Sequence, residues 1–244
     1  MLVMTPRQPR DRRRWTTTLA ADIPPGPDGQ PAHEAGAEVT VITAVNLLGV
    51  GGVSFAVPRP STLLLEAAEQ HLRVAARLRA QAVKQVRRVR WIQPGMEWSF
   101  ANEQLVMDFF REAIAGIICA FAALDNLANE LLPWDFAYTD PDVGQTRTRE
   151  DLERNSGIEL RLSRVAALAT GRTNLRTADP ELWRRLTQLK VLRDDLVHAK
   201  ANQALPADDV YGSIFARVFN ALDVDARSIV DDVRAAADHY LGRP

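Results

Sequence analysis

The chain of 244 residues contains a single cysteine, Cys119, and only four histidines. One cysteine excludes an internal disulfide, and its position in the most apolar segment indicates a buried, unreactive thiol. A reducing, cytoplasmic setting is the corresponding expectation. Three of the histidines, His33, His71 and His239, have no partners at the spacing of metal ligands, so the sequence predicts no metal site and no cofactor.

The sequence also lacks a long hydrophobic run. The uncharged segment 113–124 comprises twelve residues, which is too short to span a bilayer and is typical of a buried helix. No continuous apolar stretch follows the basic N-terminus, so we expect neither a secretory signal nor a membrane partner. With 46% hydrophobic and 25% charged residues, the composition is that of a globular protein with a sizeable core.

Charge of one sign is not in excess, because the formal net charge is −1. The charges are unevenly distributed, however: the N-terminus and residues 73–90 are basic, and the C-terminal region is acidic. Four cations of the second basic stretch form a stripe on a predicted helix: Arg73, Arg77, Lys84 and Arg88. This stripe either contacts an RNA backbone or is a solvated helix face. Trp91 and Trp98, which follow it, either stack on bases or pack inside the fold.

Proline and glycine concentrate in the first part of the chain. The prolines of residues 1–36 interrupt regular structure, so we expect a loosely ordered segment with a short strand at 15–19. In residues 37–60, two β-branched segments flank a glycine-rich stretch at 49–52, and this pattern predicts a β-hairpin or two short strands. No Gly-Lys-Ser/Thr is present, which favours a turn over a phosphate-binding loop at these glycines.

From residue 61 onward, apolar residues recur at helical spacing. The predicted helices span 61–93, 102–132, 148–171, 179–202 and one or two segments of 207–241, with a loop at 133–147. Capping signals support these limits: Thr148 with Asp151, Gly171 as a C-cap, and Asp179 followed by Pro180. The core face of the third helix is expected to contain Ile158, Leu162, Val165 and Leu168. The predicted fold is mainly α, a four- or five-helix bundle over residues 61–241 with a small N-terminal β-hairpin element.

One predicted helix carries an arginine, an acidic residue and a histidine within six positions: Arg193, Asp194 and His198. At 100° per residue, Asp194 and His198 lie on one helix face, where the carboxylate can fix the imidazole tautomer. Arg193 and His198 lie about 140° apart and flank a surface. A second copy across a two-fold axis would bring both pairs into one cleft.

These three residues match an R-x4-H signature, and the segment resembles the HEPN family of helical domains. The context is similar too. The helix that carries the motif has a leucine-rich face before it. A long apolar helix earlier in the chain ends near Asn129 and Glu130. The resemblance covers roughly residues 100–240, and residues 1–60 have no counterpart in it.

The resemblance implies a metal-independent endoribonuclease that acts as a homodimer on RNA. His198 would act as general base on the 2′-hydroxyl or as acid on the leaving group, and Arg193 would stabilise the phosphoryl charge. A polar residue of the preceding helix, Asn129 or Glu130, would hydrogen-bond Arg193. Such domains are typical of toxin–antitoxin or phage-defence systems, so an antitoxin or other regulatory protein is a possible partner.

Two other interpretations stay open. In the first, the chain is a non-catalytic dimeric HEPN module whose cleft binds a nucleotide, RNA or a protein. In the second, it is a purely structural interaction protein, in which Arg193 and His198 face no common cavity.

Overall fold

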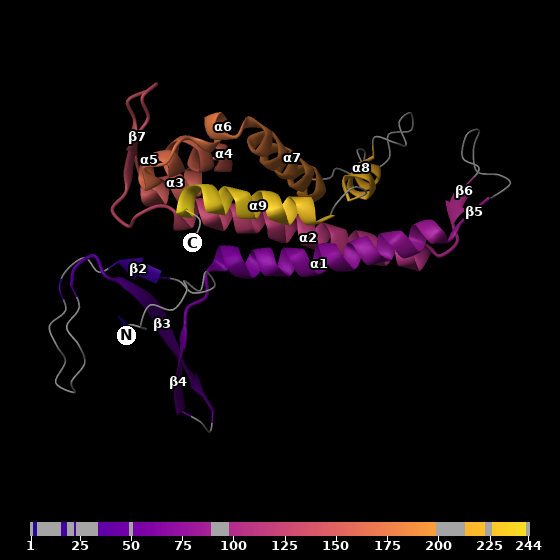
Figure 1. Ribbon diagram of the computed structural model, residues 1–244, viewed down its shortest axis with the longest axis horizontal. Coiled ribbons are helices and arrows are strands. Elements are labelled where there is room, and N and C mark those ends of the chain that lie inside the picture. The colour runs from indigo at the N-terminus through magenta and orange to yellow at the C-terminus, as the bar shows by residue number, and fades with distance from the viewer. Residues whose placement is uncertain are drawn as a thin grey trace. The chain divides into compact units, whose positions relative to one another are not determined.

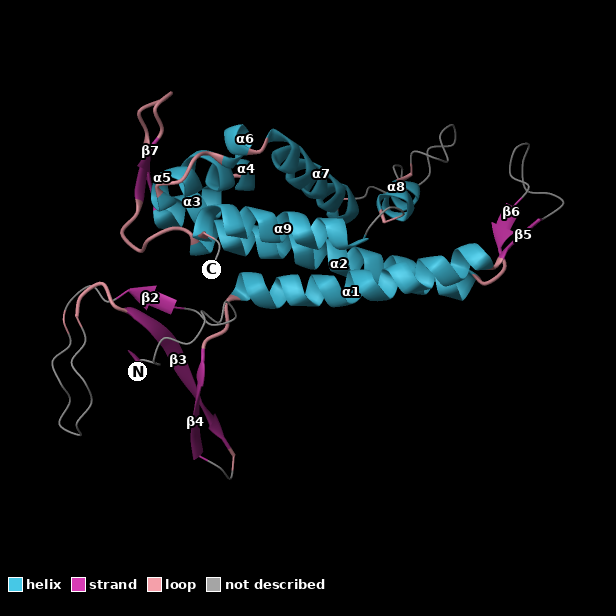
Figure 2. Cartoon of the chain, viewed as in Figure 1, coloured by secondary structure: helices cyan, strands magenta, loops and turns pink. Residues whose placement is uncertain are grey.

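The computed structural model describes residues 2–3, 16–18, 22, 34–48, 51–88, 98–198, 213–222 and 226–242. The fold is mainly helical with a small antiparallel hairpin near the N-terminus, as the sequence predicts (Figure 1, Figure 2). The chain divides into two compact units, residues 1–63 and 64–243.

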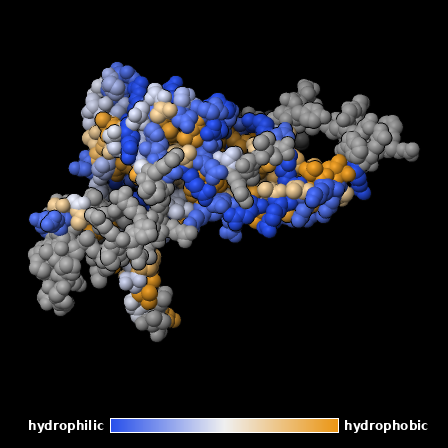
Figure 3. All heavy atoms as spheres, viewed as in Figure 1, coloured by the Kyte–Doolittle hydropathy of each residue, from blue (hydrophilic) through white to orange (hydrophobic). Residues whose placement is uncertain are grey.

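The first unit is built on the predicted hairpin of β3 (Glu38–Leu47) and β4 (Gly51–Ala56), which pair in antiparallel register from Ile42 opposite Ala56 to Leu47 opposite Gly51. Gly51 has a φ of 93°, a conformation that favours glycine. The hairpin exposes Val45, Val53 and Phe55 (Figure 3).

Two further strands pair with β3. The strand expected at 15–19 is confirmed as β2 (Thr16–Thr18), which is antiparallel to β3. A second strand, β1 (Leu2–Val3), also pairs with β3, so this part of the segment expected to be loosely ordered is regular. A strand of two residues is too short to show an alternation of apolar and polar side chains, so β1 is recognised only by its pairing with β3.

The second unit contains the helices. From residue 60 onward the elements are α1 (Pro60–Lys84), β5 (Val86–Arg88), β6 (Trp98–Phe100), α2 (Glu103–Glu130), β7 (Ala137–Thr139), β8 (Thr146–Thr148), α3 (Arg149–Asn155), α4 (Ile158–Leu160), the π-helical turn η1 (Arg161–Val165), α5 (Ala166–Thr170), α6 (Leu175–Ala178), α7 (Pro180–Val197), α8 (Ile214–Ala221) and α9 (Ala226–Leu241).

Helix α2 is the centre of this unit, and α7, α8 and α9 pack against it (Figure 1). Its side chains at Phe109, Ile117, Leu124 and Leu127 are at most 2% exposed. The successive spacings of eight, seven and three residues place them on one helix face. Cys119 is half-buried, and burial raises the pKa of its thiol, which agrees with an unreactive cysteine.

Helix α1 is shorter than predicted. It ends at Lys84, and Val86–Arg88 instead pair with Trp98–Phe100 in a two-stranded ribbon. The Phe100 ring lies 5.6 Å from that of Phe219 on α8. This contact between residues far apart in the chain favours the ribbon over a continuation of helix α1 past residue 84.

The segment 133–147, predicted as a loop, contains a second short ribbon of β7 and β8. Thr139 and Thr146 share a hydrogen bond of 3.0 Å across it. Beyond the ribbon the predicted capping box is confirmed. The Thr148 hydroxyl accepts from the Asp151 backbone, and the Asp151 carboxylate accepts from the Thr148 backbone.

The third predicted helix is not continuous. It divides into α3, α4, η1 and α5, and it ends as predicted at Gly171, whose φ is 66°. Leu168, expected in the core, is 62% exposed. A π-helical turn accommodates an extra residue, so positions after η1 rotate away from the face that Ile158 and Leu162 define.

Helix α7 begins as predicted. The Asp179 side chain accepts a hydrogen bond from the Leu182 backbone, and Pro180 is the first helical residue. The helix ends at Val197 instead of near residue 202. Residues 199–212, which include the predicted core position Val210, lie outside the described part. The C-terminal region forms two helices, α8 and α9, with Val218 and Val233 buried.

A search of the described helices for one long and apolar enough to cross a membrane finds none.

Candidate functional site

The candidate site lies on the C-terminal half of α7. The Arg193 guanidinium lies over the Phe121 ring of α2, with 4.6 Å between its central carbon and the ring centroid. Phe121 is 7% exposed, whereas the Arg193 side chain is 32% exposed. A cation over an aromatic face gains about 0.5–2 kcal/mol, depending on its solvation. The ring therefore supports a guanidinium that still reaches solvent.

Asp194 fixes the other side of this guanidinium. Its Oδ1 accepts a hydrogen bond of 2.7 Å from Nη1 of Arg193, and its Oδ2 accepts one of 3.1 Å from Nζ of Lys190. Burial raises the pKa of the Asp194 carboxyl, but the hydrogen bonds from Arg193 and Lys190 outweigh this effect and lower the pKa below 3.8. The hydrogen bond to Asp194 in turn raises the pKa of Lys190.

This arrangement differs from the expected role of Asp194. We expected its carboxylate to orient the His198 imidazole, but both carboxylate oxygens are occupied by Arg193 and Lys190. The i, i+4 spacing predicts the face correctly. The partners are two charged donors, and hydrogen bonds from charged donors to a carboxylate are the strong ones.

His198 is exposed at the end of α7. Its backbone N–H donates to the Asp194 carbonyl at 2.9 Å, and its φ of −106° and ψ of 17° are no longer helical. The structure thus brings Arg193 and Asp194 into contact. His198 lies five positions after Arg193, at the residue where the helix ends.

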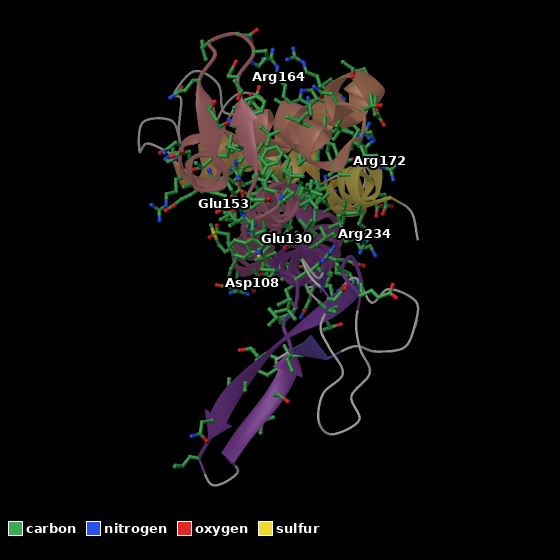
Figure 4. All side chains as sticks on the ribbon, turned by 90° about the vertical axis from the view of Figure 1, so that its left-hand side faces the viewer. Asp108, Glu130, Glu153, Arg164, Arg172 and Arg234 are labelled. Atoms are coloured by element: carbon green, nitrogen blue, oxygen red, sulfur yellow. The ribbon has the colours of Figure 1, made fainter. Side chains whose placement is uncertain are left out.

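The Asn129 side chain, at the end of α2, does not have the predicted partner. Asn129 was expected to hydrogen-bond Arg193, but its side-chain oxygen accepts from Nη1 of Arg161, a residue of η1 that is only 5% exposed. Nη2 of Arg161 donates to Asp125 at 2.6 Å. Glu130, the other candidate, is half-buried at the end of the same helix (Figure 4). The Asn129 oxygen is therefore occupied by a buried cation that anchors η1 to α2.

The predicted basic stripe is only partly present. Arg73, Arg77 and Lys84 are exposed on α1, but Arg88 lies on β5, and its side chain is outside the described residues. Arg73 donates to Glu69 at 2.7 Å, and Glu69 also pairs with Arg234 of α9 (Figure 4).

The hydrogen bond from Arg234 is the main cause of the lowered pKa of Glu69. Part of the positive charge on this face is therefore neutralised. Trp91 and the side chain of Trp98, which were expected either to stack on bases or to pack, lie outside the described residues.

Sequence reasoning missed Phe121 and Arg161. The contact of Lys190 with Asp194 has the i, i+4 spacing of a helical ion pair, and the sequence offers it as the alternative to an Asp194–His198 contact. Phe121 was assigned only to the core, and nothing local indicates that an arginine 72 positions later covers it. Arg161 is the first residue of the π-helical turn η1, and we identify no sequence signal for this turn.

Among the residues that the structure describes, no group of three or more His, Cys, Asp or Glu side chains is arranged to hold a metal ion. No protein-family model, curated protein or solved structure matches this chain. The resemblance to the HEPN family therefore stays a prediction from the sequence.

Proposed function

We propose that this protein is a metal-independent endoribonuclease of the HEPN type, with Arg193 and His198 as its catalytic residues. The observation that supports the proposal best is the state of Arg193. Phe121 and Asp194 hold its guanidinium in one place while about a third of the side chain remains exposed. A preoriented cation of this kind suits a phosphoryl group, whose charge it meets without reorganisation.

In the proposed reaction the nucleophile is the 2′-hydroxyl of the RNA itself. His198 removes the proton from this hydroxyl or donates one to the departing 5′-oxygen. Nε and Nη2 of Arg193, which have no hydrogen-bond partner among the described residues, contact the non-bridging phosphate oxygens. The products are a 2′,3′-cyclic phosphate and a 5′-hydroxyl.

The proposal includes a homodimer. A single imidazole can be base or acid in one step, whereas cleavage needs both. Two α7 helices related by a two-fold axis supply two imidazoles and two guanidiniums to one cleft. A toxin or phage-defence role, with an antitoxin or other regulatory protein as partner, is an expectation from the resemblance alone.

The test is incubation of the full chain with structured RNA in EDTA, with analysis of the 3′ ends by mass spectrometry. We expect cleavage that leaves cyclic phosphates, and a loss of about 100-fold or more in His198→Ala. His239→Ala is the matched control, since His239 hydrogen-bonds the Thr173 carbonyl on another part of the unit. Cleavage that His198→Ala leaves intact would contradict the proposal.

A second function has one observation in its favour. Asp194 hydrogen-bonds Arg193 and Lys190, and within the described residues no carboxylate hydrogen-bonds the His198 imidazole to fix its tautomer. A non-catalytic dimeric module that binds a nucleotide, RNA or a protein partner does not need that tautomer. Wild-type protein and His198→Ala that both bind the RNA and both leave it uncut would favour the module.

A further inference from the structure

A pocket of about 360 Å³ opens beside the first half of α7. Its walls come from three places in the chain. Glu159, Ser163 and Arg164 come from α4 and η1, Arg176 comes from α6, and Trp183 and Thr187 come from α7. One wall is the π-helical turn, a rare geometry that occurs frequently at functional sites.

The pocket and the candidate site lie along one face of α7. Trp183, Thr187, Lys190 and Asp194 recur at steps of four, three and four, so they lie within a narrow arc of the helix. Ion contacts join the two ends of this face. Lys190 lies 3.6 Å from Glu159 in the pocket wall and 3.1 Å from Asp194, which in turn holds Arg193.

The lining contains the three kinds of group that bind a nucleotide. Trp183 is half-buried and offers an aromatic face, on which any base can stack. Glu159 is an acceptor for base N–H groups. Arg164 and Arg176 are cations that suit a phosphate.

Both cations are accessible. Arg164 pairs with Asp142 at 2.7 Å, but the two side chains are 49% and 70% exposed (Figure 4), and such surface pairs are weak. Arg176 is exposed and has no ion-pair partner in the described ranges. A phosphate can therefore displace Asp142 and bridge the two guanidiniums.

We propose that this pocket binds one nucleotide of the RNA substrate, with its base on Trp183 and its phosphate between Arg164 and Arg176. The proposal rests on the endoribonuclease function, because it makes the pocket a subsite of that reaction. Trp183 and Arg193 are ten residues apart on one helix, a distance of about 15 Å along the axis. A few nucleotides of single-stranded RNA cover this distance, so the pocket would select a base near the cut.

The test measures binding of the four ribonucleoside 5′-monophosphates to the full chain by titration calorimetry. We expect Arg176→Ala to weaken binding at least fivefold. Arg184→Ala is the matched control, because Arg184 is an exposed arginine of α7 that pairs with Glu181 and does not line the pocket. Trp183→Ala should weaken binding about 5- to 150-fold, and Trp183→Phe should restore most of it. Binding should persist in Arg193→Ala.

The outcomes separate this proposal from the proposed function. Nucleotide binding lost in Arg176→Ala and kept in Arg184→Ala supports the pocket, even if the protein cuts no RNA. RNA cleavage whose rate and base preference are unchanged in Arg176→Ala and Trp183→Ala, in a protein that binds none of the four nucleotides, overturns the pocket and leaves the endoribonuclease proposal intact.

Discussion

Leu72 of α1 occupies the space that a side chain at Gly116 of α2 would need. A Cβ atom at position 116 would lie 2.6 Å from Cγ of Leu72 and 3.2 Å from its backbone nitrogen. Leu72 is 1% exposed, and it belongs to the same buried cluster as Phe109 and Ile117. The absence of a side chain at Gly116 thus lets Leu72 pack directly on the α2 backbone.

We expect Gly116→Ala to destabilise the protein. Overpacking costs about 1–3 kcal/mol, and the better helix propensity of alanine returns up to about 1 kcal/mol. The free energy of unfolding in urea should therefore fall by about 1–2 kcal/mol. Gly52→Ala, at a position with no atom within 4 Å, is the control and should not lower it. The double variant Gly116→Ala/Leu72→Ala should lose less than the sum of its two single changes, and strict additivity would refute the contact.

The ion pair of Arg161 and Asp125 predicts an asymmetry. Arg161 is 5% exposed, whereas the Asp125 side chain is 37% exposed. Asp125→Ala leaves a guanidinium buried without its counter-charge, at a cost of about 3 kcal/mol. Arg161→Met leaves a carboxylate that water can reach, so the cost should be about 1–2 kcal/mol. Equal losses in urea denaturation, or a larger loss for Arg161→Met, would contradict this account.

Two adjacent aspartates of α7, Asp194 and Asp195, have different partners and therefore different expected effects on activity. Asp194 holds Arg193 and Lys190, whereas Asp195 pairs with Arg217 of α8. Asp194→Asn should lower RNA cleavage up to about 100-fold, because a displaced guanidinium no longer meets the phosphate. Asp195→Asn should leave the rate unchanged. Stability should change by at most about 1 kcal/mol in both, since these ion pairs are partly exposed.

The lowered pKa of Asp194 predicts how the site responds to acid. Burial raises this pKa, but Arg193 and Lys190 lower it below the ordinary value of 3.8. Since the folded pKa is below the unfolded one, the contact stabilises the protein above the ordinary value and is lost as pH falls through the lower folded value. Arg193 should therefore stay in place above about pH 5. We expect Asp194→Asn to lower the pH–rate profile of RNA cleavage over this range without changing its shape.

Much of the helical framework could be predicted from local signals. Asp179 and Pro180 predicted the start of α7, Thr148 and Asp151 that of α3, and Gly171 the end of α5. Each of these signals acts on a backbone group within four residues, so the sequence alone contains both partners. The hairpin of β3 and β4 could also be predicted from the sequence, because a short turn joins its two strands.

The sequence alone thus predicted a mainly helical protein with an N-terminal hairpin, and it placed Arg193, Asp194 and His198 within six positions at the C-terminal end of α7. Tertiary structure alone decided what those side chains contact. Three features join residues that are far apart in the chain: the contact of Arg193 with the Phe121 ring, the hydrogen bond from Arg161 to Asn129, and the pocket between η1 and α7. Helical period fixes the face on which a side chain lies, but the packing of other elements on that face determines its partner.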